Sequence, residues 1–188
     1  MTTSASRWLR ADVRAALVLI TLAAGLSRSG TAQPIAASTL KAAFMLNFAK
    51  FAEWPAREPA LPILVCVSAS DEVADAMART IKGQVIGGRA LQVSQIVSAG
   101  SVRDCQMLFV ADRDPRRLAA ILEEASRFPV LTVSDIEQSS TNGVMVELFR
   151  ENGRMRFAIN IDAVGRSPVR ISSQLLALAK ITRDPPAR

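Results

Sequence analysis

The sequence contains no histidine and no tyrosine, only two cysteines, and few aromatic residues. Without histidine, neither a Ser-His-Asp nor a Cys-His catalytic site can form, and no metal site can use imidazole ligands. Two cysteines are also too few for a four-cysteine zinc site. We therefore predict no catalytic residues, no cofactor and no metal site.

The chain has 188 residues, which suits one domain, and its only apolar run of note is near the N-terminus. Residues 1–32 are typical of a secretory signal peptide: three arginines precede an apolar run at 15–26, and small residues occupy 30–32. Cleavage would leave residues 33–188 as a single periplasmic domain without stable membrane insertion. The alternative is an uncleaved N-terminal anchor, although a membrane span needs about 20 residues.

The net charge of +6 suggests a nucleic-acid partner at first sight. Residues 1–32 carry four Arg and one Asp, so the rest of the chain has 19 basic and 16 acidic residues, a net +3. These basic residues are scattered, and no DNA- or RNA-reading motif is present. We predict no nucleic-acid partner.

Helical and strand patterns alternate along the chain. A continuous apolar run predicts a strand buried on both faces at 63–67, largely apolar runs predict two more buried strands at 105–110 and 130–133, and an alternating pattern predicts a strand at 91–96. Two further strands, 144–149 and 155–161, flank Asn152-Gly153, a strong hairpin signal. Helices are expected at about 39–52, 71–81, 115–125 and from 172 or 173 to about 181.

This order predicts an α/β fold. Strands that alternate with helices form a parallel sheet, and a terminal hairpin adds antiparallel strands. We expect a single mixed sheet, mostly parallel with an antiparallel C-terminal hairpin, and helices on both faces.

Cys66 and Cys105 lie in two of the predicted core strands. In an oxidising compartment an even pair of cysteines usually forms a disulfide, here closing a loop of about 40 residues. A redox-switching pair and two buried free thiols are the alternatives. A catalytic thiol is not expected, because no histidine can activate it.

An exported enzyme would have to use carboxylates, Lys or Ser. Ser134-Asp135 follows a predicted strand, where open α/β sheets place ligands, and the same residues equally suit a helix cap.

Nine short blocks stand out along the chain: LKAAF (40–44), NFAKF (47–51), EWP (53–55), VCV (65–67), GRAL (88–91), CQMLFV (105–110), LTVSD (131–135), RMRFAIN (154–160) and ISSQLL (171–176). Together, and in this order, they resemble the YfiR family over about residues 38–180. Each block is weak alone, but the EWP block, both cysteines and the ISSQLL block are specific together. The sequence departs from the family at Ala158, where members commonly have Glu in an FEIN-like stretch, and it lacks the second cysteine pair of some members.

The resemblance implies a periplasmic α/β protein, often dimeric, so a homodimer is one expected partner. It also implies a regulator that binds the periplasmic domain of a membrane-bound diguanylate cyclase and represses it, which lowers cyclic di-GMP and restrains biofilm formation. Such binding needs exposed apolar residues. Phe48, Phe51 and Trp54 are the predicted partner-binding residues, because the first helix has more aromatics than one core face needs; the alternative is that all three are core.

A second hypothesis is a periplasmic sensor of a small ligand, a nucleotide or an amino acid, that acts on another membrane receptor. Polar residues gather between the last predicted strand and the last helix, and they are the predicted ligand-binding residues: Asn160, Arg170, Ser172, Ser173 and Gln174. Serines at a helix start can donate to an anion, and Arg170 could pair with one. The alternative is plain helix capping by Ser172.

Overall fold

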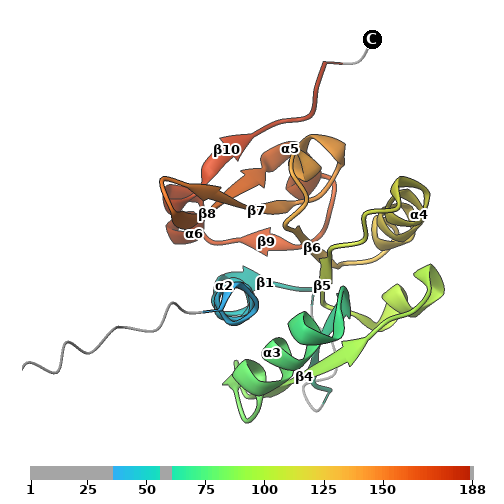
Figure 1. The fold of residues 1–188 in the computed structure, drawn as a ribbon, viewed down its shortest axis with the longest axis vertical. Coiled ribbons are helices and arrows are strands. Elements are labelled where there is room, and N and C mark those ends of the chain that lie inside the picture. Colours follow the sequence, from blue (N-terminus) through green and yellow to red (C-terminus); the bar gives the residue numbers. More distant parts are fainter. Residues whose placement is uncertain (1–35, 56–60, 187–188) are drawn as a thin grey trace, which may run out of the picture. The chain divides into compact units, whose positions relative to one another are not determined.

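The computed structural model describes residues 36–55 and 61–186, and it contains the predicted mixed sheet (Figure 1). Its eight strands are ordered β10-β8-β7-β6-β5-β2-β4-β3. They are β2 (Ile63–Ser68), β3 (Val85–Ile86), β4 (Arg89–Gln95), β5 (Met107–Val110), β6 (Leu131–Ser134), β7 (Val146–Glu151), β8 (Arg154–Asn160) and β10 (Lys180–Thr182).

Strand pairing confirms the predicted fold class. Strands β4, β2, β5, β6 and β7 pair in parallel, whereas β7 and β8 form the predicted antiparallel hairpin. The hairpin turn places Asn152 and Gly153 at positive φ values of 50° and 75°, the conformation that makes Asn-Gly favourable there. Of the two edge strands, β10 pairs in parallel with β8 and β3 pairs antiparallel with β4.

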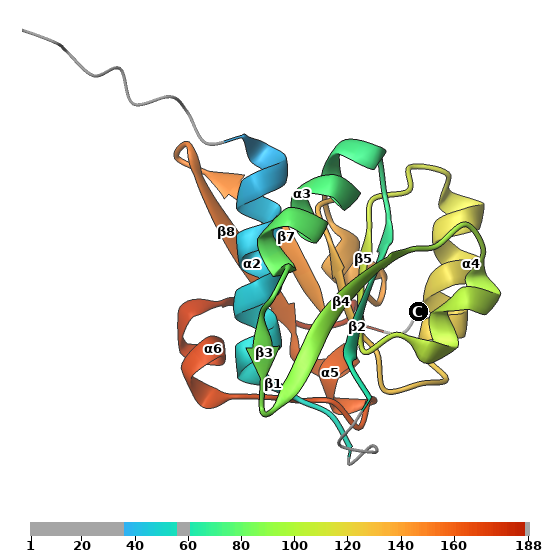
Figure 2. The same ribbon diagram turned by 90° about the horizontal axis from the view of Figure 1, so that it is seen from below.

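Helices cover both faces of the central strands (Figure 2). On one face, α2 (Ala37–Phe51) and α3 (Asp71–Ile81) pack over a core that includes Val65, Val67 and Phe109. On the other, α4 (Pro115–Ala125) and the 3-10 helix η1 (Ala99–Asp104) pack over a second core that includes Leu108 and Val110. Successive residues of a strand point to opposite faces, and both faces are covered, so these strands are mostly apolar.

The chain after β8 differs from the prediction. It runs through a short helix α5 (Ile161–Gly165), strand β9 (Arg170–Ile171), helix α6 (Ser173–Leu178) and then β10. The predicted last helix thus stops at Leu178, and Ile181 belongs to a strand. The reason is that residues 180–182 pair with β8, and Ile and Thr are β-branched residues that favour strands. Strand β9 pairs with β1 (Ala52–Glu53) in a separate two-stranded sheet.

The disulfide between Cys66 and Cys105 is confirmed. Cys66 lies on β2, Cys105 lies just before β5, and the Cα–Cα distance is 5.8 Å, within the range that a disulfide requires. The two cysteines are 0% and 2% exposed. A buried disulfide is shielded from thiols in solution, so its position favours the structural role over redox switching.

The predicted signal peptide lies outside the residues that the structure describes. Among the described residues, none of the helices combines the length and the apolarity that crossing a membrane requires.

Candidate interaction sites

The three aromatic residues predicted to bind a partner have different environments. Phe48 is 0% exposed, and its ring packs against Phe44 and Phe157 with centroid distances of 5.8 and 5.2 Å. A side chain without exposed surface cannot anchor a partner in this conformation, so Phe48 is a core residue and its prediction as a contact is corrected. Phe51 and Trp54 are partly exposed and pack on the edge of the same core.

Trp54 is held in place by a hydrogen bond. Its indole Nε1 donates to the backbone oxygen of Gln106 at 2.7 Å, while the Gln106 side chain accepts from the backbone N–H of Leu64 at 2.7 Å. The segment after α2 is thereby tied to the starts of β2 and β5. A tryptophan fixed at its polar edge presents its remaining surface at low entropic cost, which suits a contact residue.

Trp54 and Arg170 line one shallow cavity of about 520 Å³. The antiparallel pairing of β1 with β9 sets Glu53 opposite Arg170, and Pro168 completes the apolar side of the cavity. Sequence reasoning assigned Trp54 to a protein partner and Arg170 to a ligand, and the structure places them at one site.

Asn160 forms side-chain hydrogen bonds with three segments of the chain. Its side chain is 0% exposed, and its Oδ1 accepts from the backbone N–H groups of Asp162 and Ala163, at 3.0 Å each, capping α5. Its Nδ2 donates to the backbone oxygen of Ser140 at 2.5 Å and to Asp184 at 2.7 Å. The amide is fully used within the protein, so the structure assigns Asn160 to capping, not to a ligand.

The predicted serine cluster is a helix start. Ser172 Oγ accepts from the backbone N–H of Leu175 at 3.3 Å, which makes Ser172 the N-cap of α6. Ser173 and Gln174 are exposed on the first turn of this six-residue helix. Of the five residues predicted to bind a ligand, Arg170 lines a cavity, the one that it shares with Trp54.

Asp184 joins the C-terminal segment to α5. Its carboxylate forms an ion pair with Arg166 and accepts from Asn160, and its backbone N–H donates to Asp162 at 3.1 Å. The hydrogen bonds from Arg166 and then Asn160 hold the pKa of Asp184 below its ordinary value, outweighing burial, which raises it.

This lowered pKa predicts a specific pH dependence. A carboxyl with a depressed folded-state pKa contributes stability above its unfolded pKa, about 3.9, and loses it as the pH falls through the folded value. Asp184→Asn should therefore melt at a lower temperature than the wild type at neutral pH, with the difference shrinking below a pH of about 4. Thermal melting across this range tests it, with Asp75→Asn, an exposed residue on α3, as control. A difference that is constant with pH would contradict the prediction.

Ser134-Asp135 lies at the carboxyl end of β6, as predicted, beside a cavity of about 780 Å³. Asp135 forms an ion pair with Lys41 of α2 at 2.5 Å, and Ser134 Oγ accepts from the backbone N–H of Ile136 at 3.1 Å. Both side chains thus fix the loop after β6. No group of three or more potential metal ligands occurs within the described residues.

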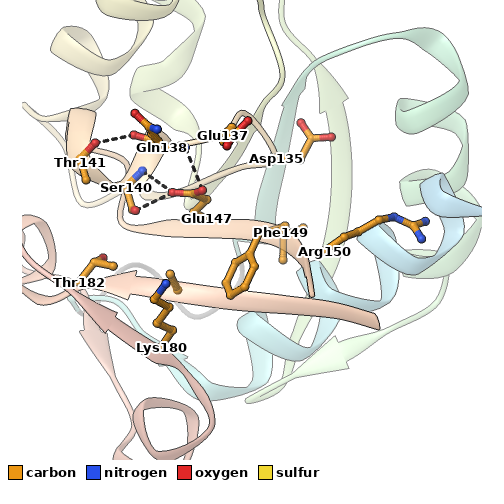
Figure 3. A pocket seen from close by; sticks show the side chains of 12 residues that line it. Asp135, Glu137, Gln138, Ser140, Thr141, Glu147, Phe149, Arg150, Lys180 and Thr182 are labelled. Atoms are coloured by element: carbon orange, nitrogen blue, oxygen red, sulfur yellow. Dashed lines mark hydrogen bonds between the residues drawn. The ribbon is translucent and has the colours of Figure 1, made fainter. Parts of the chain in front are cut away.

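A further cavity, of about 580 Å³, lies beside the hairpin and β10, and the sequence did not predict it (Figure 3). Its walls include Glu147 and Phe149 of β7, Ala158 of β8 and Lys180 of β10, together with the loop after β6. The one available signal was Glu147, a carboxylate between the apolar residues 144–146 and Leu148-Phe149.

The sheet, its two helical layers and these cavities define an α/β domain whose described surface offers sites for binding. Residues 38–180 match the sequence profile described as YfiR/HmsC-like, so the chain belongs to the YfiR/HmsC-like family. The resemblance seen in the sequence is thereby confirmed, and the family is regulatory rather than catalytic.

A solved structure shares the fold. The conserved domain protein from Vibrio cholerae O1 biovar El Tor strain N16961 is 9% identical and superposes with a TM-score of 0.51. The match covers 78% of this chain and 60% of that chain, so this chain spans well under the full length of that protein. At this identity the similarity concerns the fold alone.

Proposed function

We propose that the protein is a periplasmic regulator that binds the periplasmic domain of a membrane-bound diguanylate cyclase and represses it, lowering cyclic di-GMP. The observation that carries the proposal is the family match over residues 38–180. The buried disulfide supports an oxidising compartment. Repression requires only that the regulator bind an inactive conformation of the cyclase more tightly than the active one.

The end of α2 and the elements beside it form the binding surface that we favour. The backbone N–H of Ser172 donates to the oxygen of Phe51 at 2.9 Å, which joins the end of α2 to the start of α6. Phe51 and Trp54 are partly exposed, and Leu178 at the end of α6 is 68% exposed. Arg170, on β9, adds a positive charge, so apolar and polar groups are mixed as in transient interfaces.

Co-purification tests this function. The protein and a full-length cyclase with a periplasmic domain would be expressed together, solubilised in detergent and captured through the regulator. We expect the cyclase to be recovered, and Phe51→Ala and Leu178→Ala each to weaken binding about tenfold, as truncation of an apolar interface residue does. Val97→Ala, which truncates an 81% exposed valine on the segment after β4, is the matched control.

Cyclic di-GMP provides the second measurement. Deletion of the gene should raise the cellular level, and the wild-type gene should restore it, whereas the Phe51→Ala gene should restore it only partly. Recovery of no cyclase or related receptor, together with an unchanged cyclic di-GMP level after deletion, would refute the proposal.

The cavity beside Glu147 favours a second function, sensing of a small ligand by the same domain. Its walls do not include the five residues predicted from the sequence to bind a ligand. The one connection is Ser140, which lines the cavity and whose backbone oxygen accepts a hydrogen bond from Asn160.

A further inference from the structure

The cavity in Figure 3 lies on the hairpin face opposite α2. Phe157 and Ile159 of β8 belong to the core under α2, so Ala158, which lies between them, points to the other face. Ala158 is 3% exposed and contributes only a methyl group to the cavity. The small side chain leaves room at this point of the sheet.

Glu147 places a buried carboxylate at one end of the cavity. The residue is 8% exposed, and its carboxylate accepts from the backbone N–H groups of Gln138 and Ser140, at 3.0 and 2.9 Å, and from Ser140 Oγ at 2.6 Å. No Lys or Arg of the described residues forms an ion pair with it. A carboxylate has about four acceptor positions and three are used here, so Oε1 retains one that a cationic group can occupy.

Lys180 supplies the opposite charge at the other end. Ala158 pairs with Glu147 on one side and with Lys180 on the other, so these two residues stand two strands apart, about 10 Å between backbones. The Lys180 ammonium lies 5.7 Å from the centre of the Phe149 ring. In Figure 3 it extends toward the same space as Glu147, whereas Arg150 extends away.

Thr182 adds an unused hydrogen-bonding group. Thr182 lies two positions beyond Lys180 on β10 and lines the same cavity. Its Oγ1 is buried and has no hydrogen-bond partner in the described part of the chain. Most buried polar atoms are paired, so this hydroxyl is available to a polar group of a ligand that reaches it.

We propose that this cavity binds a small zwitterion, an α-amino acid, with its ammonium on Glu147 and its carboxylate on Lys180 and Thr182. The ammonium and the carboxylate of one amino acid can each form a charge-assisted hydrogen bond of about 2.8 Å, one with Glu147 and one with Lys180, which stand on the same face of the sheet two strands apart. A purely cationic or purely anionic ligand would leave one of the two charges unmatched. The ligand's side chain contacts the Phe149 ring.

The proposal specifies the ligand class and the location of the second candidate function. It is tested on the isolated mature chain. The common L-amino acids are screened at millimolar concentration by thermal shift, because a ligand that binds only the folded state raises the melting temperature. The best amino acid is then measured by calorimetry beside its methyl ester, which lacks the negative charge, and its N-acetyl derivative, which lacks the positive one.

We expect one or more amino acids to bind, and both derivatives to bind at least about tenfold more weakly, since each loses a charge-assisted contact. Lys180→Gln should weaken binding to a similar degree, and Ala158→Leu, which fills the cavity, should abolish it. Lys180 is exposed, so its variant should fold normally, and Lys82→Gln, at the exposed end of α3, is the control. Glu147→Gln is interpreted only if its melting temperature without ligand is unchanged.

Absence of any shift in the screen would overturn the proposal. The proposal would also be overturned if the methyl ester and the N-acetyl derivative bound as tightly as the free amino acid. The same holds if Lys180→Gln and Ala158→Leu left the affinity for the amino acid unchanged. The amino-acid assays contain no cyclase, and the co-purification is carried out without added amino acid. Failure of amino-acid binding therefore leaves the cyclase proposal standing, and failure of cyclase capture leaves the amino-acid proposal standing.

Discussion

Replacing Cys66 and Cys105 together by alanine is expected to lower the free energy of unfolding by about 4 kcal/mol. The disulfide separates its cysteines by 39 residues in sequence, and the chain-entropy relation for a loop of that length gives about 4 kcal/mol. For a domain of this size the loss corresponds to a fall of roughly 10 °C in melting temperature. Alanine is preferred to serine because both positions are buried, and a hydroxyl there would be left without a partner.

Urea unfolding of the wild type and the double variant, both without reductant, measures this effect. The wild type in dithiothreitol is the internal control. Because the sulfurs are buried, the native protein should react slowly with the reductant, and the reduced protein should then unfold like the double variant. Equal stability of the two proteins without reductant would show that the cysteines are not joined. Rapid reduction of the native protein would instead favour the redox-switching role.

The central sheet could be predicted from the sequence because its strands are buried on both faces. The largely apolar runs at 63–67, 105–110 and 130–133 have few other stable arrangements in a chain of this length. Asn152-Gly153 fixed the hairpin for an equally local reason, since both residues adopt positive φ. These predictions depended on neighbours in sequence and needed no knowledge of the tertiary structure.

The C-terminal region could not be predicted in the same way. Residues 180–182 continue a helical apolar pattern, and they form a strand because the edge of β8 is available for pairing. Polar residues at strand-to-helix junctions pose a related problem: Asn160 and Ser172 have the composition of a ligand site and the position of helix caps. Their bonding partners decide between the two roles, and these partners are fixed only by the fold.

The cavity beside Glu147 could not be predicted from the sequence, because its walls depend on the register in which the strands pair. Ala158 is notable in the sequence as a departure from an FEIN-like stretch, whereas Glu147 was not singled out. Their opposition across the hairpin, with Lys180 on the next strand, follows from the pairing of β7, β8 and β10. The Asn152-Gly153 turn sets the register between β7 and β8, but no local pattern specifies the register of β10 on β8, and a shift of one residue there would move Lys180 to the opposite face.

Phe48→Ala is expected to destabilise the protein by about 3 to 5 kcal/mol, the range for removal of a buried phenylalanine ring. The reason is that Phe48 has no exposed surface and packs between Phe44 and Phe157, so the truncation leaves a cavity under α2. Phe51→Ala, three residues further along the same helix and partly exposed, should cost clearly less stability and should instead weaken cyclase capture.

Urea unfolding and the capture assay together separate these roles. If Phe48 serves the core, its variant should lose stability in proportion to the missing ring, and the fraction that remains folded should bind the cyclase as the wild type does. A Phe48→Ala protein of normal stability that fails to bind would instead show that α2 rearranges to expose this ring to the partner. That outcome would transfer the binding surface from the end of α2 to its buried face, because only a displaced helix could present Phe48.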